Sequence, residues 1–205
     1  VHLSVEGLKR ITEPVDILDR DAFEKELNEL GSLRAKADAI RTRLAKSINT
    51  KYQENPAYYE NFSKRIKEAL ELYKARTITE AEYLAKMRDI LEDYRTGKSA
   101  IAYPNRIRAN VHAQAFYGVL TAIFSNEKLS VEPDFAAEMA LDITTIIEKH
   151  SQVDWTHNLT IHDRISQDID DLFYRYQKEM GLVLSFDVID MIIENVKTVA
   201  LRRFA

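Results

Sequence analysis

The chain has 205 residues, 45% of them hydrophobic and 30% charged, which suffices for one compact domain with its own core and excludes an intrinsically disordered chain. A formal net charge of −4 excludes binding that depends on bulk attraction to nucleic acid or to an anionic membrane. The chain has no cysteine, which excludes disulfides and thiolate metal sites and fits a cytoplasmic location. With only 5 glycines and 4 prolines it has little material for hairpins, so we expect an all-α fold.

Residues 1–18 show no sustained hydrophobic period, so we interpret them as an arm or linker that follows an upstream domain. We expect residues 19–205 to form a single α-helical domain. Its first helix is short and acidic; Asp19 or Asp21 caps its start and Gly31 ends it. The side chains expected to face the core are Phe23, Leu27 and Leu30.

A second helix is predicted to follow Ser32. Its apolar side chains recur every three or four residues up to Ile48, which indicates one buried stripe. The opposite face is predicted to be strongly basic, because Asp38 is the only acidic residue between 33 and 53. The candidate contact residues on this face are Arg34, Lys36, Arg41, Arg43, Lys46 and Lys51.

Two further helices are predicted before residue 97. Asn55-Pro56 marks the start of the first, because proline suits the first helical turn. Thr79 and Glu82 form a capping box that opens the second, and Gly97 ends it. The link between the two helices is so short that they should form an antiparallel hairpin.

The stretch 104–124 is predicted to be a helix at the centre of the fold, because no charged residue occurs between Arg108 and Glu127. On a helical wheel its apolar side chains occupy two nearly opposite sides, so other helices should surround it. A membrane span needs about 20 mostly apolar residues, and this stretch carries Asn110 and His112. We therefore expect a buried helix, with His112 as a hydrogen-bonded core histidine, and no membrane segment.

Three more helices complete an expected bundle of about eight. The first starts at Pro133, the second at a cap formed by Thr160 with Asp163, and the third after Ser185. The loop before the second of these helices contains Trp155, the only tryptophan, which should plug an edge of the core.

Two motifs suggest chemistry at first sight. Residues 96–99 (TGKS) look like the end of a phosphate-binding loop, but the earlier glycine of that motif is missing and a helix, not a strand, precedes it. His157 and His162 lie close in sequence to Asp154 and Asp163, but a spacing of five does not align the two histidines on one helix face. We predict a helix stop in the first case and capping or surface hydrogen bonds in the second, with metal binding through the loop as the alternative. No catalytic, cofactor or metal site is predicted.

Charge is segregated along the chain. Residues 33–53 carry six basic side chains and one acidic side chain, whereas residues 132–171 carry two basic and ten acidic ones. Ordinary solvated helices whose charges pair within the fold are one explanation. The other is a basic surface that contacts a partner subunit or the DNA backbone, because lysines and arginines on a helix bind phosphates without reading the base sequence.

Several helix starts and packing segments follow one another in an order that points to a known family. They are residues 55–60 (NPAYYE), 63–66 (SKRI), 78–84 (ITEAEYL), 115–120 (AFYGVL), 153–155 (VDW) and 181 to the end of the chain. In this order they resemble the C-terminal helical region of the R subunits of type I restriction–modification enzymes, the subunits that carry the motor and the endonuclease. The resemblance covers the chain from residue 55 onward.

In that family the R subunit carries a metal-dependent nuclease domain, two ATP-driven motor lobes, and a helical region that helps attach it to the methyltransferase core. None of the nuclease or ATPase motifs is matched in this sequence. The resemblance therefore implies a non-catalytic assembly domain, without a cofactor of its own, from an ATP- and Mg-dependent DNA translocase and endonuclease. Its implied partners are the methyltransferase and specificity subunits. The alternative is a DNA-backbone-binding module that uses the basic face of residues 33–53.

Overall fold

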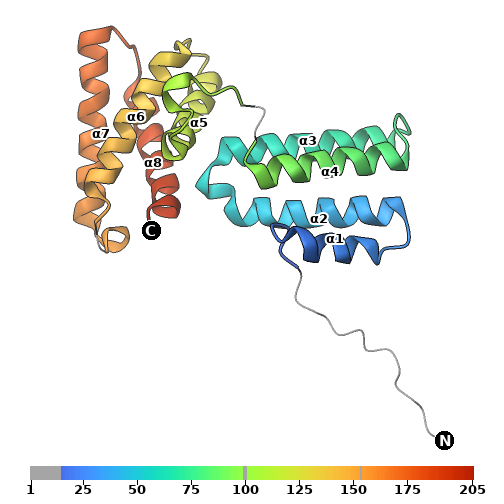
Figure 1. The fold of residues 1–205 in the computed structure, drawn as a ribbon. Coiled ribbons are helices and arrows are strands. Elements are labelled where there is room, and N and C mark those ends of the chain that lie inside the picture. Colours follow the sequence, from blue (N-terminus) through green and yellow to red (C-terminus); the bar gives the residue numbers. More distant parts are fainter. Residues whose placement is uncertain (1–14, 99–100, 153) are drawn as a thin grey trace, which may run out of the picture.

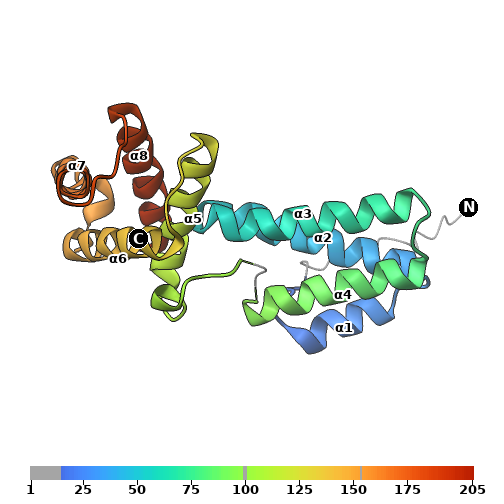
Figure 2. The same ribbon diagram turned by 90° about the horizontal axis from the view of Figure 1, so that it is seen from above.

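The computed structural model describes residues 15–98, 101–152 and 154–205. Within these ranges the fold is all-α, with eight α-helices, three short 3-10 helices and no strand, which confirms the predicted fold class (Figure 1). Most of the predicted arm, residues 1–14, lies outside the described part of the chain. The helices form two groups of four, one from each half of the chain, which Figures 1 and 2 show next to each other.

The N-terminal group begins its helices at the predicted signals. Ser32 Oγ accepts a hydrogen bond from the Ala35 N–H at 3.1 Å, and Thr79 and Glu82 form a complete capping box. Both arrangements satisfy N–H groups that the first helical turn leaves free. The four helices are α1 (Arg20–Asn28), α2 (Leu33–Lys51), α3 (Pro56–Lys74) and α4 (Glu80–Thr96). As predicted, α3 and α4 form an antiparallel hairpin (Figure 1).

One hydrophobic cluster, which we call the N-terminal cluster, holds α1–α4 together. The Arg65 guanidinium also bridges α3 to α4 by donating to Asp93 at 2.6 Å. Fully burying a side chain such as Leu, Ile or Phe contributes about 1.5–3 kcal/mol, so the shared core is the main source of stability in this group. Its buried members are Ile17, Phe23, Leu27, Ala37, Ile40, Leu44, Ile48, Tyr59, Phe62, Ile66, Ala69, Tyr83, Leu84, Met87, Ile90, Leu91 and Tyr94.

The C-terminal group has a hydrophobic cluster of its own, the C-terminal cluster. Trp155 belongs to it, is only 3% exposed, and donates its Nε1–H to the Phe204 carbonyl at 3.0 Å. The predicted plug therefore connects the loop before α7 with the end of α8. The helices of this group are α5 (Val111–Asn126), α6 (Pro133–His150), α7 (Leu159–Met180) and α8 (Phe186–Arg203).

The helix predicted for residues 104–124 begins later than expected. A 3-10 turn at Asn105–Ile107 comes first, and α5 starts only at Val111. The reason is a local cap, because Asn110 Oδ1 accepts a hydrogen bond from the Ala113 N–H at 2.9 Å. Nine of the sixteen residues of α5 are buried, although the Val111 side chain is 57% exposed. That the whole molecule is organised around this helix stays a prediction.

The start of α7 was also predicted wrongly. Its cap is Asn158, whose Oδ1 accepts from the Thr160 N–H at 3.1 Å, so Thr160 lies inside the first turn. Asparagine and threonine are both common N-cap residues. Asn158 is the cap here because it directly follows the 3-10 turn that contains Trp155, so α7 begins immediately after that turn.

The two groups meet where α5 packs against the start of α3. Gly118 lies at this contact, and a Cβ atom added to it would be 2.6 Å from the Ala57 Cβ. The missing side chain of Gly118 therefore sets how closely the two helices approach. Asn55, which is 7% exposed, caps α3 at the same place by accepting a hydrogen bond from the Tyr58 N–H at 3.2 Å.

Candidate functional site

The six candidate cations of α2 do not share one face of the helix. At about 100° per residue, Arg34 and Arg41 occupy one flank, and Lys36 and Arg43 occupy a position about 200° away from them. Between these flanks lies the buried stripe of Ala37, Ile40, Leu44 and Ile48. The continuous basic face expected from the sequence is thus divided into two parts.

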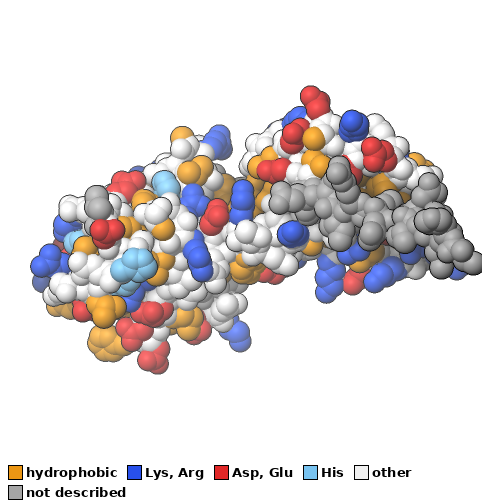
Figure 3. All heavy atoms as spheres, turned by 90° about the horizontal axis from the view of Figure 1, so that it is seen from below, with side chains coloured by type: hydrophobic (Ala, Val, Ile, Leu, Met, Phe, Trp, Pro, Cys, Tyr) orange, Lys and Arg blue, Asp and Glu red, His pale blue; other side chains and the backbone are white. Residues whose placement is uncertain are grey.

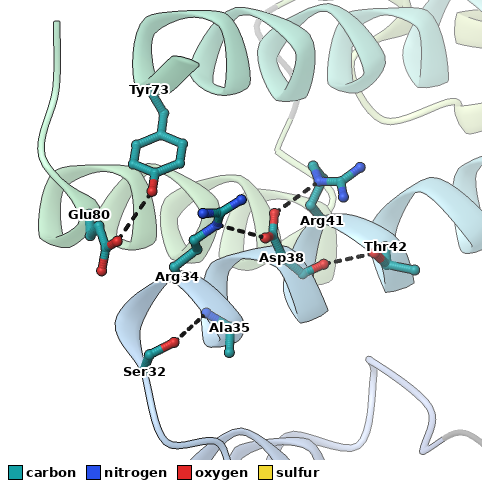
Figure 4. A network of polar contacts seen from close by, with 8 residues as sticks. All are labelled: Ser32, Arg34, Ala35, Asp38, Arg41, Thr42, Tyr73 and Glu80. Carbon is teal, nitrogen blue, oxygen red and sulfur yellow. Dashed lines mark hydrogen bonds and ion pairs between the residues drawn. The ribbon is translucent and has the colours of Figure 1, made fainter. Parts of the chain in front are cut away.

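On the first flank, the charges of Arg34 and Arg41 are partly compensated within α2, because both arginines pair with the same carboxylate. Asp38 lies between them, 3.7 Å from Arg34 Nε and 3.4 Å from Arg41 Nε (Figure 4). The Arg34 guanidinium also lies 6.0 Å from the centre of the Tyr73 ring, where the ring attracts a cation. These contacts direct the two arginines toward the α3–α4 hairpin, which favours a structural role for them.

On the second flank, cations border a hollow of about 450 Å³ between α2 and residues 15–18. Arg43, Lys46 and Lys51 contribute three positive charges to its lining, and Asp16 contributes the one carboxylate. Arg43 donates to Glu26 Oε1 at 2.7 Å. We call this feature the cationic hollow.

Lys46 and Lys51 are the candidate cations best placed for an external partner. Neither forms an ion pair among the described residues, and Lys46 is exposed. Lys36 is half-buried and likewise has no ion pair in the described part of the chain. Figure 3 shows Lys and Arg side chains along the lower edge of the half of the molecule that α1–α4 form. Of the six predicted contact residues, the three lysines without an ion pair in the described chain therefore lie away from the flank that carries Arg34 and Arg41.

The phosphate-loop lookalike ends a helix. Gly97 adopts a left-handed conformation with φ 72°, and its N–H donates to the Tyr94 carbonyl at 3.4 Å, which are features of a helix C-terminus. Lys98 follows it, and Ser99 lies outside the described residues. No strand precedes the motif in the described chain, so the arrangement differs from a phosphate cradle.

His162, one of the two histidines near the start of α7, has a packing role. The His162 ring contacts the Trp155 ring edge-on, with the centroids 5.7 Å apart, and His157 is exposed. Across residues 15–98, 101–152 and 154–205, no three side chains of His, Asp or Glu are grouped as they would be to hold a metal ion. The His157–His162 loop thus offers no ligand cluster within these ranges.

Arg203, at the end of α8, has a role that sequence reasoning missed. As a basic residue in the last turn of α8, Arg203 would ordinarily interact only with the negative end of the helix dipole. Its guanidinium instead donates to the carbonyls of Glu54 at 3.1 Å and Val111 at 2.9 Å, and to His112 Nδ1 at 3.3 Å. It thereby links α8 to both α5 and the segment before α3. No local pattern predicts a contact between residues about 90 to 150 positions apart.

His112 is hydrogen-bonded, as predicted, but it is half-buried on α5 and does not belong to the C-terminal cluster. Burial and the nearby Arg203 charge both lower the pKa of His112 below its usual value of 6.5. Because Nδ1 accepts a hydrogen bond from Arg203, the ring is neutral in this arrangement. His112 therefore acts as an acceptor at the junction of the two groups.

The chain matches a known protein family along nearly its whole length. None of the described helices is long and apolar enough to cross a membrane. Neither a curated protein nor a solved structure matches the chain significantly. A family model described as "Type I restriction enzyme HindI endonuclease subunit-like, C-terminal" matches residues 5–200. The match covers nearly the whole sequence, so the chain belongs to this family of C-terminal regions of type I restriction enzyme endonuclease subunit-like proteins.

Proposed function

We propose that this chain is the helical assembly domain of a type I restriction enzyme R subunit, and that it attaches the motor subunit to the methyltransferase core. The observation that carries the proposal is the family match over residues 5–200. Its partners are then the methyltransferase and specificity subunits, and its location is the cytoplasm. An all-α body with two hydrophobic clusters suits this role, because packed helices present fixed surfaces to a partner.

We further propose that the chain is not catalytic and needs no cofactor, whereas its parent enzyme uses ATP and Mg²⁺. The motif nearest to a nucleotide site, around Lys98, is a helix stop. We expect the purified chain neither to hydrolyse ATP nor to cleave DNA. Turnover that survives purification and disappears in Lys98→Ala would contradict this.

Capture of the methyltransferase–specificity complex by the immobilised chain tests the attachment. We expect retention in the absence of DNA and ATP. Leu120→Asp is a suitable negative control, because it places a charge at a position with 0% exposure and should unfold the domain. If the folded wild-type chain fails to retain the complex while the full-length R subunit is retained, this region is not the attachment point.

A second candidate function is contact with the DNA backbone through the cationic hollow. It is favoured by Lys46 and Lys51, which line the hollow and have no ion pair in the described chain. Lys46→Glu with Lys51→Glu should then weaken DNA binding for every sequence, and the loss should be greatest at low salt. The matched control is Lys64→Glu with Lys67→Glu on the exposed side of α3. Equal DNA binding by both double variants would remove the hollow from the functional account.

A further inference from the structure

Exposed large hydrophobic side chains are concentrated in one short segment near the end of the chain. Five of the eleven such side chains among the described residues lie between 174 and 191. Phe186 is 84% exposed and Tyr174 is 64% exposed. Exposed apolar side chains that lie together on a folded chain typically mark an interaction site, and two of these five, Tyr174 and Phe186, lie at one hollow. The exposed residues of this segment are Tyr174, Met180, Val183, Phe186 and Met191.

Tyr174 and Phe186 border one hollow of about 290 Å³ between α7 and α8. Its lining includes Ile189, which is 3% exposed, together with Asp170 and Asp171 at the rim. We call this feature the α7–α8 hollow. It combines an apolar floor, two aromatic side chains and two carboxylates, so it offers space for an apolar anchor beside a place for positive charge.

The shape of the hollow is maintained by the connection between the two helices. Gly181 ends α7 in a left-handed conformation with φ 68°. The Gln177 side chain then donates to the Leu184 carbonyl at 2.9 Å, and Leu184 is 8% exposed. Phe186 is the first residue of α8, directly after the cap formed by Ser185. The exposed ring is therefore carried on an ordered turn.

The surroundings of the hollow are acidic. Residues 170–191 contain five carboxylates and two basic residues. One of these, Arg175, pairs with Asp142 at 3.3 Å. Asp170 and Asp171 form no ion pair in the described chain. Asp171 also borders a neighbouring hollow with Lys149, but Lys149 pairs with Asp168 at 2.8 Å. The hollow thus carries uncompensated negative charge.

We propose that the α7–α8 hollow docks an amphipathic helix of another protein, with an apolar anchor between Tyr174 and Phe186 and lysines or arginines opposite Asp170 and Asp171. Burial of the exposed apolar surface drives the association. The carboxylates select the partner, because like charges facing each other oppose binding. For the same reason the hollow disfavours nucleic acid, anionic lipid, and a second copy docking through the identical face. This inference does not depend on attachment to the methyltransferase.

Two synthetic helical peptides test the proposal on the 205-residue chain. One carries leucines on one face and lysines on the other, and the second has glutamates in place of the lysines. We expect the Leu/Lys peptide to bind in a fluorescence anisotropy titration and the Leu/Glu peptide not to bind. Equal binding of both peptides would refute the claim that the carboxylates of the hollow select a basic partner.

Matched variants locate the binding site. Phe186 and Leu159 are each the first residue of a helix and are 84% and 76% exposed, so Phe186→Ala is compared with Leu159→Ala. Asp170→Lys is compared with Asp163→Lys, because both aspartates are exposed on α7. We expect Phe186→Ala and Asp170→Lys each to weaken Leu/Lys binding about tenfold, or about 1.4 kcal/mol, and both controls to bind like the wild type.

Unchanged thermal unfolding of the four variants establishes that they are folded. Test variants that bind the Leu/Lys peptide as tightly as their controls would refute the proposal. Sedimentation equilibrium tests whether a second copy of this chain occupies the hollow instead. Self-association of the wild-type chain that is lost in Phe186→Ala but kept in Leu159→Ala would assign the hollow to a second copy and would also refute the proposal.

Discussion

Replacing Gly118 by alanine should push the two helical groups slightly apart at their contact and destabilise the fold. The added Cβ would lie 2.6 Å from the Ala57 Cβ, whereas ordinary contact begins at 3.4 Å, so α5 and α3 must move apart by about 0.8 Å. Neither Cβ can rotate away, because both are bonded directly to the backbone. The displacement therefore has to be taken up by the helices, which carry Asn55 and its cap with them.

The free energy of this change has two parts of opposite sign. Overpacking of a close contact typically costs about 1–3 kcal/mol. Alanine is better than glycine in a helix interior by about 1 kcal/mol, which offsets part of this cost. We expect a net destabilisation of about 1 kcal/mol. For a chain of this length that corresponds to a decrease in Tm of about 2–4 °C.

A double-mutant cycle separates the two parts. Ala57→Gly removes the atom that Gly118→Ala would meet, so in that background Gly118→Ala should be stabilising. The coupling free energy between the two substitutions should be about 1–3 kcal/mol. Denaturant unfolding followed by circular dichroism and by fluorescence of Trp155, the only tryptophan, measures it.

Gly31 supplies the control, because a Cβ atom added there would have no neighbour within 4 Å. Gly31→Ala should leave the free energy of unfolding unchanged or raise it slightly. A Gly118→Ala chain that is as stable as the wild type, with no coupling to Ala57→Gly, would show that α3 and α5 do not approach as closely as described.

Three other predictions concern the core and the junction. Leu120→Asp should unfold the domain, because an unpaired charge at a fully buried position costs several kcal/mol, whereas Ala122→Asp, exposed on the same helix, should melt like the wild type in a circular dichroism scan. Arg203→Met should lower the free energy of unfolding by about 1–3 kcal/mol, because the part-buried Glu54 carbonyl loses its donor, and an unchanged denaturation midpoint would contradict that role. Because the pKa of His112 is lowered in the folded chain, its contribution to stability is complete above about pH 6.5 and is lost as pH falls through that value toward the folded pKa. Tm measured from pH 8 to pH 5 should therefore fall less in His112→Gln than in the wild type.

Most helix boundaries could be predicted because they depend on neighbouring residues. Ser32 and the pair Thr79–Glu82 cap the helices that follow them, and Gly97 ends α4 in the left-handed conformation that glycine adopts without strain. The buried stripes follow from helical spacing in the same way. The errors at Asn110 and Asn158 occurred where a short 3-10 turn precedes the helix, so the helix begins at a cap other than the expected start.

The sequence by itself determined an all-α chain, the positions of most helices and the side chains that each helix buries, because these properties depend on residues within a few turns. Only the tertiary structure decided which helices share a hydrophobic cluster and how closely the two groups approach at Gly118 and Ala57, because both depend on residues far apart in the sequence. The tertiary structure also decided that some α2 cations pair with Asp38 whereas others border the cationic hollow. Finally, it left Phe186 exposed, because a side chain at a helix start is buried only if another part of the fold covers it.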